Sequence, residues 1–355
     1  MSEEETVAAV RASGLYKVFG RRPERAARAL ADGVSRDEVR RTGAVPAVLD
    51  ASFDVAPGEI FVVMGLSGSG KSTLIRMLNG LSRPTAGTVE VGDVDITQMR
   101  PKALRALRQS TVSMVFQHFA LLPHRCVLDN VAFPWEIKGM PLQQRRDKAR
   151  EALDMVGLAS WAGSMPGELS GGMQQRVGLA RAFAAGTDIL LMDEAFSALD
   201  PLIRRDMQEQ LLQLQARLGK TIVFITHDLN EAMRVGDRIA VMRDGGIVQI
   251  GTAEQILTSP ANEYVARFVA DVDRSKVLTA RAIMEPPDGK VDTANGSTTV
   301  APDTPVAELL TPAATDPKPI VVVDSDKHVL GVVPRVTLLT ALANGHSTVE
   351  DSDGR

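Results

Sequence analysis

Cysteine is almost absent from this chain of 355 residues, since Cys126 is its single copy and no intramolecular disulfide can form. The amino terminus, Met1–Thr6, is acidic and has neither the basic start nor the apolar run of a secretory signal peptide. Together, these two absences predict a cytosolic protein.

Long hydrophobic runs are also missing. The longest uninterrupted apolar segments, such as Ile189–Met192 and Ile320–Val323, fall far short of the roughly 20 residues that span a bilayer. A membrane role would therefore have to go through a partner protein.

The chain has no excess of positive charge, because 40 basic residues face 44 acidic ones and the net charge is −4. A general nucleic-acid binder usually carries a basic excess, so we expect no nucleic-acid partner. At about 150 residues per domain, the length predicts two or three folding units. The apolar content of 44% is enough for a full-sized core and excludes disorder as the dominant state.

Short β-rich apolar segments alternate with helical patterns over about residues 10–270. The helical patterns include Arg145–Val156 and Arg204–Leu218. The expected strands are Ile60–Met64, Val112–Phe116, Ile189–Met192, Thr221–Thr226 and Ile239–Met242. This alternation predicts an α/β domain with a mostly parallel sheet.

An arginine-rich segment, Arg21–Gly43, interrupts the early strand region with seven arginines and four acids. It predicts two short helices, marked by Pro23 near one start, Gly33 as a stop, Ser35 and Glu38 in capping-box spacing, and Gly43 as a second stop. We favour a solvated pair of surface helices. Docking onto a membrane or a partner subunit is the alternative, and nucleic-acid binding is disfavoured.

The tail from Glu285 onward differs in composition from the rest. Its 11 acids and 5 bases give it a net charge of −6, and Pro286–Gly289 and Asn295–Thr299 have the composition of a linker. Beyond the linker, the pattern predicts a strand at Pro319–Val323, a turn at Asp324–Lys327, a strand at Val329–Val333 and a helix at Val336–Ala343. We expect a separate acidic module.

A glycine-rich phosphate-binding loop follows the strand Ile60–Met64 and precedes the helical run Leu74–Leu78. Its motif, G-x-x-x-x-G-K-[ST], supplies Gly65, Ser67, Gly68, Ser69, Gly70, Lys71, Ser72 and Thr73. The glycines let backbone N–H groups converge on phosphates, Lys71 reaches the β and γ oxygens, and the Ser72 hydroxyl can ligate Mg²⁺. The loop predicts an ATP site.

Two carboxylates, Asp193 and Glu194, end the expected strand Ile189–Met192. Side chains alternate along a strand, so the two point in different directions. We assign Asp193 to the Mg²⁺ shell and Glu194 to the attacking water, because phosphoryl transfer depends on positioning and charge stabilisation.

A second glycine-rich helix entry, Leu169–Arg176, would also favour an anion at its amino terminus. With its Leu-Ser-Gly-Gly-x-Gln run, the sequence resembles the nucleotide-binding subunits of ATP-binding-cassette (ABC) transporters, whose signature this is. The resemblance implies a P-loop ATPase domain with a helical subdomain carrying the signature. It also implies a head-to-tail dimer with two ATP sites, each completed by the partner's Ser170, Gly171, Gly172 and Gln174.

The same resemblance assigns roles to further residues. Gln117 corresponds to the glutamine that senses Mg²⁺ and the attacking water and links to the permease, and His227 to the histidine that contacts the γ-phosphate. Ser197–Asp200, with Asp200 among the nucleotide-site residues, matches the loop that communicates across the dimer. Phe19 is our choice for the aromatic that stacks on adenine, with Tyr16 as a competitor.

Within the ABC family, the insertion, the run Gly65–Gly68 and the run Met192–Arg204 resemble the ATPase subunits of glycine betaine/proline betaine (quaternary-amine) importers. That resemblance implies a peripheral subunit on the cytoplasmic face of the membrane, working with integral-membrane permease subunits and a separate substrate-binding protein. It also implies a tail of the cystathionine-β-synthase (CBS) type. We therefore expect an ATPase domain at 1–275, a linker at 276–302, one CBS-like motif at 303–345 and a disordered end at 346–355.

The tail departs from the CBS pattern in two ways. Only one copy of the motif is recognisable, so we expect it to pair with the tail of a second subunit. Pro334 and Thr337 stand where adenosyl-binding members usually have a hydroxyl residue and an aspartate, which disfavours nucleotide sensing. An ionic-strength sensor, a membrane-surface sensor and a dimerisation module stay open; salt would act by screening the acidic tail.

Other readings of the ATPase remain. An importer for methionine, polyamines or another solute would share the ATP chemistry. A soluble ABC protein acting on DNA or ribosomes is disfavoured, because Gly70 and Ser170 are only 100 residues apart and the chain has a single cassette. A vestigial ATPase is disfavoured because every required position is filled.

Overall fold

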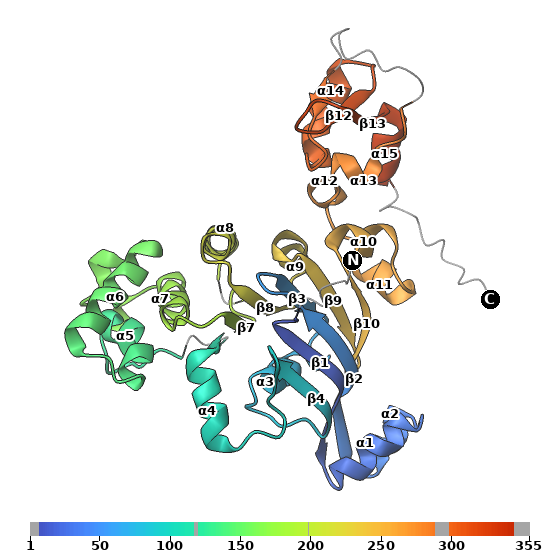
Figure 1. Ribbon diagram of the computed structural model, residues 1–355. Coiled ribbons are helices and arrows are strands. Elements are labelled where there is room, and N and C mark those ends of the chain that lie inside the picture. Colours follow the sequence, from blue (N-terminus) through green and yellow to red (C-terminus); the bar gives the residue numbers. More distant parts are fainter. Residues whose placement is uncertain (1–6, 117–119, 198, 288–297, 344–355) are drawn as a thin grey trace, which may run out of the picture. The chain divides into compact units, whose positions relative to one another are not determined.

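The computed structural model describes residues 7–116, 120–197, 199–287 and 298–343 (Figure 1). It divides into two compact units, Met1–Ile250 and Gly251–Arg355. The predicted α/β fold with a P-loop is confirmed in the first unit. Helices α10 (Ala253–Thr258) and α11 (Glu263–Phe268), which we expected within the ATPase domain, belong to the second unit. The domain boundaries at 275 and 302 stay a prediction.

A six-stranded sheet forms the centre of the first unit, in the order β10-β9-β3-β8-β7-β6. Its strands are β3 (Ile60–Met64), β6 (Val112–Val115), β7 (Ile189–Asp193), β8 (Thr221–Thr226), β9 (Arg238–Arg243) and β10 (Gly246–Gly251). Strands β3, β7 and β8 are buried at every residue, which explains why they are uninterrupted apolar runs in the sequence. The helices between strands are α3 (Lys71–Leu78), α4 (Pro101–Ser110), α8 (Pro201–Leu218) and α9 (Leu229–Val235).

Four of these strands end at the same edge of the sheet. Strands β6, β7, β8 and β3 run parallel, with Met64 beside Thr226, Asp193 beside Ile225, and Val115 beside Met192. The residues that follow the strands therefore meet at this edge, where open α/β sheets bind their ligands.

A second, antiparallel sheet has the order β2-β1-β4-β5. It consists of β1 (Val10–Gly20), β2 (Ala44–Val55), β4 (Ala86–Val91) and β5 (Val94–Asp95). Phe53 of β2 stacks on Phe61 of β3, with ring centroids 5.0 Å apart and planes within 7°. Both rings belong to one apolar cluster, so the two sheets share a core.

The arginine-rich insertion forms the two predicted helices, α1 (Pro23–Ala31) and α2 (Arg36–Arg41). The capping box between Ser35 and Glu38 is present. Gly20 and Gly43 touch at the base of the insertion, where a Cβ on Gly20 would lie 2.5 Å from the Gly43 carbonyl oxygen. The two helices lie at the end of the β1–β2 hairpin (Figure 1). Their buried side chains Ala26, Ala27 and Val39 form one apolar cluster with Val18 of β1 and Ala44 of β2.

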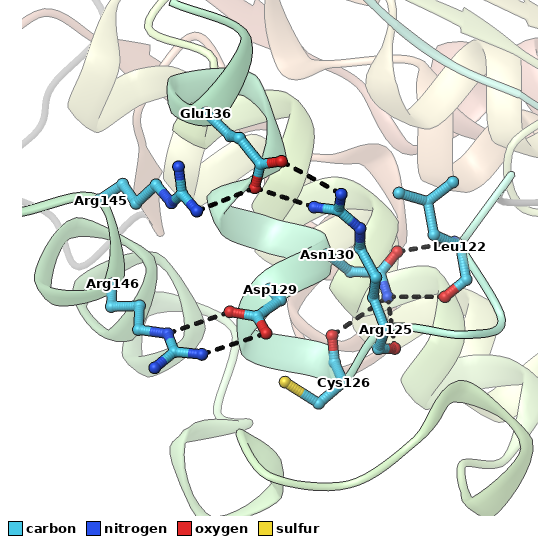
Figure 2. Close-up of polar contacts among 8 residues, drawn as sticks. All are labelled: Leu122, Arg125, Cys126, Asp129, Asn130, Glu136, Arg145 and Arg146. Carbon is cyan, nitrogen blue, oxygen red and sulfur yellow. Dashed lines mark hydrogen bonds and ion pairs between the residues drawn. The ribbon is translucent and has the colours of Figure 1, made fainter. Parts of the chain in front are cut away.

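Three helices form a separate helical lobe of the first unit (Figure 1). They are α5 (Val127–Ile137), α6 (Leu142–Met155) and α7 (Gly171–Ala184), with 3-10 turns at Ala159–Trp161 and Pro166–Glu168. Polar contacts fix α5 to α6 and to the loop before it (Figure 2). Glu136 binds Arg125 at 2.9 Å and Arg145 at 3.1 Å, and the hydrogen bond from Arg125 holds the pKa of the Glu136 carboxyl below its usual value.

Asn130 closes the loop that leads into α5 (Figure 2). Its side chain is fully buried, and its Oδ1 accepts from the Leu122 N–H at 2.7 Å. Its Nδ2 donates to the carbonyl oxygens of Leu122, Arg125 and Cys126 at 3.0, 2.9 and 3.1 Å. One amide thus satisfies four backbone groups and fixes the loop that follows the Gln117 segment.

The second unit has its own core and a three-stranded sheet, β11-β12-β13. Its remaining elements are α12 (Arg274–Val277), α13 (Ala280–Ile283), β11 (Thr299–Val300), α14 (Val306–Thr315), β12 (Ile320–Val323), β13 (Val329–Val333) and α15 (Arg335–Ala343). The predicted strand–turn–strand–helix order is confirmed. Residues 276–287, the first part of the predicted linker at 276–302, include the buried side chains of Leu278 and Ala280, which pack in this core.

Within the residues that the structure describes, no helix is both long enough and apolar enough to span a bilayer.

We predict that Asn130→Ala lowers the free energy of unfolding by about 3 kcal/mol, because it strands buried backbone groups. Chemical denaturation of the purified chain measures this. The exposed Asn230→Ala is the matched control and should change the value by less than about 0.5 kcal/mol. Equal effects for the two variants would contradict the role given to Asn130.

Candidate functional site

The phosphate-binding loop is held between neighbouring backbone segments that leave no room for side chains. At Gly70 (φ +103°), a Cβ would lie 2.2 Å from the Ala47 carbonyl oxygen of β2. At Gly65 (φ +155°), it would lie 2.3 Å from the Met242 carbonyl oxygen of β9. Only glycine fits at these two positions, so the motif's glycines are required by packing as well as by backbone conformation.

Lys71, the first residue of α3, is 4% exposed and donates to the carbonyl oxygens of Gly65 and Leu66 at 2.8 and 3.1 Å. Burial lowers the pKa of its ammonium, against the opposing effect of the Glu194 and Asp193 carboxylates. The buried Ser69 Oγ has no hydrogen-bond partner among the described residues. A buried cation and an unpaired hydroxyl in a loop of this shape fit a bound phosphate.

Asp193, the last residue of β7, lies beside the start of α3. Its Oδ1 accepts a hydrogen bond from the Ser72 Oγ at 3.0 Å. Burial raises the pKa of this carboxyl, although the Ser72 hydrogen bond opposes the shift. A hydroxyl and a buried carboxylate in contact are the oxygen ligands that Mg²⁺ takes, and a cation would offset the buried negative charge. The pair fits the predicted metal site.

Glu194 has different partners from Asp193. Its Oε2 lies 3.3 Å from the His227 Nδ1, and its backbone N–H donates to the Ile225 carbonyl oxygen at 3.0 Å. Its φ of +47° is uncommon for a residue other than glycine. Such strain persists where the surroundings impose it, as they do at this sheet edge. The predicted carboxylate and histidine therefore lie together.

A cavity of about 320 Å³ opens beside the phosphate-binding loop. Most of its lining comes from the predicted loop residues, from Glu194 and from β2; the full lining is Arg36, Arg40, Val45, Pro46, Ala47, Ser67, Gly68, Gly70, Lys71, Ser72, Thr73 and Glu194. The two arginines belong to α2 of the insertion. They were not among the residues predicted for the site, and no motif in the sequence marks them.

The structure also separates the two aromatic candidates for the adenine platform. Phe19 is 45% exposed and stands opposite Val45, which lines the cavity, in the β1–β2 ladder. Tyr16 packs against the apolar cluster under the insertion. Directly opposed residues share a face of the sheet, so Phe19 remains the better candidate. Its stacking role stays a prediction.

The signature segment lies at the start of α7. Ser170 caps this helix and accepts from the Met173 N–H at 3.4 Å, and Gln174 donates to the carbonyl oxygens of Pro166 and Leu169 at 3.0 and 3.2 Å. A Cβ on Gly172 would lie 2.7 Å from the Ile203 Cγ2 of α8. None of Ser170, Gly171, Gly172 or Gln174 lines the cavity at the phosphate-binding loop. Within one chain, the two predicted anion sites are thus separate.

Asp200 caps α8 by accepting from the N–H groups of Leu202 and Ile203, both at 3.1 Å. Arg204 donates to the Leu199 carbonyl oxygen at 3.1 Å and pairs with Asp228 at 2.7 Å. The sequence marked Arg204 only as the last residue of the run Met192–Arg204. Asp228 directly follows His227. Arg204 therefore ties the loop around Asp200 to the histidine loop. Gln117 lies outside the described residues.

We predict that Asp193→Asn leaves the nucleotide-free chain at least as stable to heat as the native chain, because the variant removes a buried charge that burial disfavours. The same variant should lose the Mg²⁺ dependence of nucleotide binding. Thermal unfolding with and without Mg²⁺-ATP measures both effects. A large loss of stability without nucleotide would contradict this account of Asp193.

Comparison with known proteins places this geometry in a family. Residues 48–197 match the family model described as ABC transporter. The chain is 55% identical over 286 residues to the glycine betaine transport ATP-binding protein OpuAA of Bacillus subtilis, covering 80% of this chain and 68% of that protein. It is 55% identical over 270 residues to the glycine betaine/proline betaine transport system ATP-binding protein ProV of Escherichia coli, covering 76% of this chain and 68% of that protein.

A solved structure shares the fold of the first unit. The dimeric ATP-binding cassette MJ0796 bound to ADP and phosphate has a TM-score of 0.58 and 31% identity, covering 69% of this chain and 98% of that one. The chain is therefore an ATPase that belongs to the ABC transporter family.

Proposed function

We propose that this chain is the ATP-hydrolysing subunit of an importer for glycine betaine, proline betaine or related quaternary amines. The observation that carries the proposal is the 55% identity to OpuAA and ProV, both named for such transport. The Fe³⁺ and methionine import proteins among the relatives are 42% and 45% identical over shorter lengths. The higher identity favours a quaternary-amine solute over methionine.

The site residues support a hydrolysis mechanism in which the chain mainly positions charge. Lys71 and the N–H groups of the loop bind the β and γ phosphates, and Ser72 and Asp193 would hold Mg²⁺, which neutralises phosphate charge when bound. Glu194 orients the attacking water and accepts its proton, while His227, 3.3 Å from Glu194, contacts the γ-phosphate. Gln117 is assigned to the metal and the water by the family resemblance alone.

The separation of the signature from the cavity supports a head-to-tail dimer. Ser170 and Gly171 are exposed at the helix entry, where they could face the phosphates bound to a second copy. MJ0796, the related cassette, is dimeric in its solved structure. In this proposal, closure of two copies on ATP drives the permease subunits at the cytoplasmic face of the membrane, and a separate binding protein delivers the solute.

The tail would then pair with the tail of the second subunit. A CBS-like identity stays a prediction for residues 303–345. Thr337 is already engaged, since its hydroxyl donates to the Glu285 carboxylate. That contact agrees with the view that this position does not bind a ribose.

We predict that Glu194→Gln keeps ATP binding and abolishes transport, because the amide cannot take a proton from water. Uptake of labelled glycine betaine is measured in cells that lack their own betaine importers. The cells express either chain together with its permease and binding protein.

Loss of uptake in the variant, with ATP binding retained, is the expected result. Substantial residual ATP hydrolysis by the variant would reject Glu194 as the catalytic carboxylate. No uptake with the native chain, despite assembly and ATP hydrolysis, would move the solute to another class.

A further inference from the structure

Helix α2 brings two arginines to the nucleotide cavity. Arg36 and Arg40 are four residues apart, so they lie on one face of the helix, and both line the cavity together with Lys71 and Glu194. They stand beside Val45–Ala47 of β2. Helix α2 therefore adds two guanidinium groups to the lining of the cavity.

Arg36 is anchored by protein groups. It is 19% exposed, its Nη1 lies 2.6 Å from the Asp244 Oδ1, and its Nη2 donates to the Pro46 carbonyl oxygen at 3.5 Å. Its Nε is buried without a hydrogen-bond partner among the described residues. With its charge matched by Asp244, Arg36 serves to hold α2 against the cavity.

The anchor for Arg36 is part of the same structure that holds the phosphate-binding loop. Asp244 sits in the turn between β9 and β10 with a φ of +53°. The next residue, Gly245, donates its N–H to the Ser69 carbonyl oxygen at 3.1 Å and accepts from the Leu49 N–H at 2.8 Å. The position of α2 is thus fixed relative to the loop that binds phosphate.

Arg40 has no comparable partner within the part of the chain that the structure describes. It is 49% exposed, and its ion pair with Asp37 spans 3.8 Å to a carboxylate that is 79% exposed. Exposed pairs of this kind contribute little, so Arg40 can exchange Asp37 for a stronger anion at small cost. The adjacent Arg41 is exposed and does not line the cavity.

The arrangement of the cavity indicates which part of a nucleotide would meet Arg40. Lys71 marks the β and γ phosphates, and Phe19 beside Val45 marks the base. The wall at Val45–Ala47 connects these two ends, because Val45 stands opposite Phe19 and the Ala47 carbonyl oxygen lies against Gly70 of the phosphate-binding loop. The ribose and α-phosphate of a nucleotide lie between its base and its β-phosphate, so they would lie along this wall. We propose that Arg40 binds the α-phosphate of the bound nucleotide and that Arg36 is the positioning residue for this contact. This inference rests on the proposed ATPase function.

The test is the affinity of the full-length chain for Mg²⁺-ATP and Mg²⁺-ADP, measured by isothermal titration calorimetry. Arg40→Ala should weaken both nucleotides about tenfold, which equals about 1.4 kcal/mol, because both carry an α-phosphate. Arg40→Lys should recover part of the loss. The matched control, Arg41→Ala, removes the same charge from the same helix and should stay within about twofold.

Steady-state kinetics separates a binding role from a loss of folded protein. Arg40→Ala should raise the KM for ATP with kcat nearly unchanged, which is the mark of binding that is equal in ground and transition states. Arg36→Ala should also raise KM, and the double variant should add little to either single change, because the two residues serve one contact.

Three results would overturn the proposal. One is native affinity in Arg40→Ala for both nucleotides. Another is a loss for ATP alone, which would place Arg40 at the γ-phosphate. The last is an equal loss of nucleotide affinity in Arg41→Ala, which would show that any positive charge on α2 has the same effect. Failure of the native chain to bind either nucleotide would instead overturn the ATPase assignment itself, together with this inference.

Discussion

The close contact of the phosphate-binding loop with its two neighbours is the constraint on which the site depends. The Ala47 carbonyl oxygen of β2 lies close to Gly70, and the Met242 carbonyl oxygen of β9 lies close to Gly65. These contacts fix the loop in both sheets at once. The loop that leads into Lys71 is therefore held in place by both sheets.

Two buried ionisable groups, Lys71 at the start of α3 and Asp193 at the end of β7, lie beside this loop. Burial disfavours the charged forms of both Lys71 and Asp193, whose pKa values shift in opposite directions. Buried charges of this kind contribute little to the stability of the fold. A nucleotide would give Lys71 a phosphate partner, and the proposed Mg²⁺ would offset the charge of Asp193.

Much of the fold and of the site could be predicted from local sequence. The strands that end in the phosphate loop and in Asp193 are apolar runs of the right length. The insertion helices carry their own start signals, a capping box at Ser35 and a proline, Pro23, in the first turn. Contacts between distant residues could not be predicted in this way. Arg36 and Asp244 are 208 residues apart, and nothing local to either marks the pair.

The roles of single polar side chains could not be predicted from the sequence either. Asn130 looks like any helix-embedded asparagine in the sequence, yet it satisfies four backbone groups of one loop. The segment around Leu278 was predicted as part of a linker, but its apolar side chains are buried because they pack in the core of the second unit. The local sequence shows which side chains are apolar, whereas their burial depends on the distant residues that pack against them.

The contact between Gly20 and Gly43 has an evolutionary consequence. Because the insertion leaves and rejoins the β1–β2 hairpin at a single point without side chains, its removal or replacement would leave the strand ladder intact. A segment joined in this way can be replaced by a longer or shorter one, because the entropic cost of closing a loop changes only slowly with its length. New surface chemistry can be added at the exposed positions of this insertion, provided that Arg36 and Arg40 of α2 stay at the cavity.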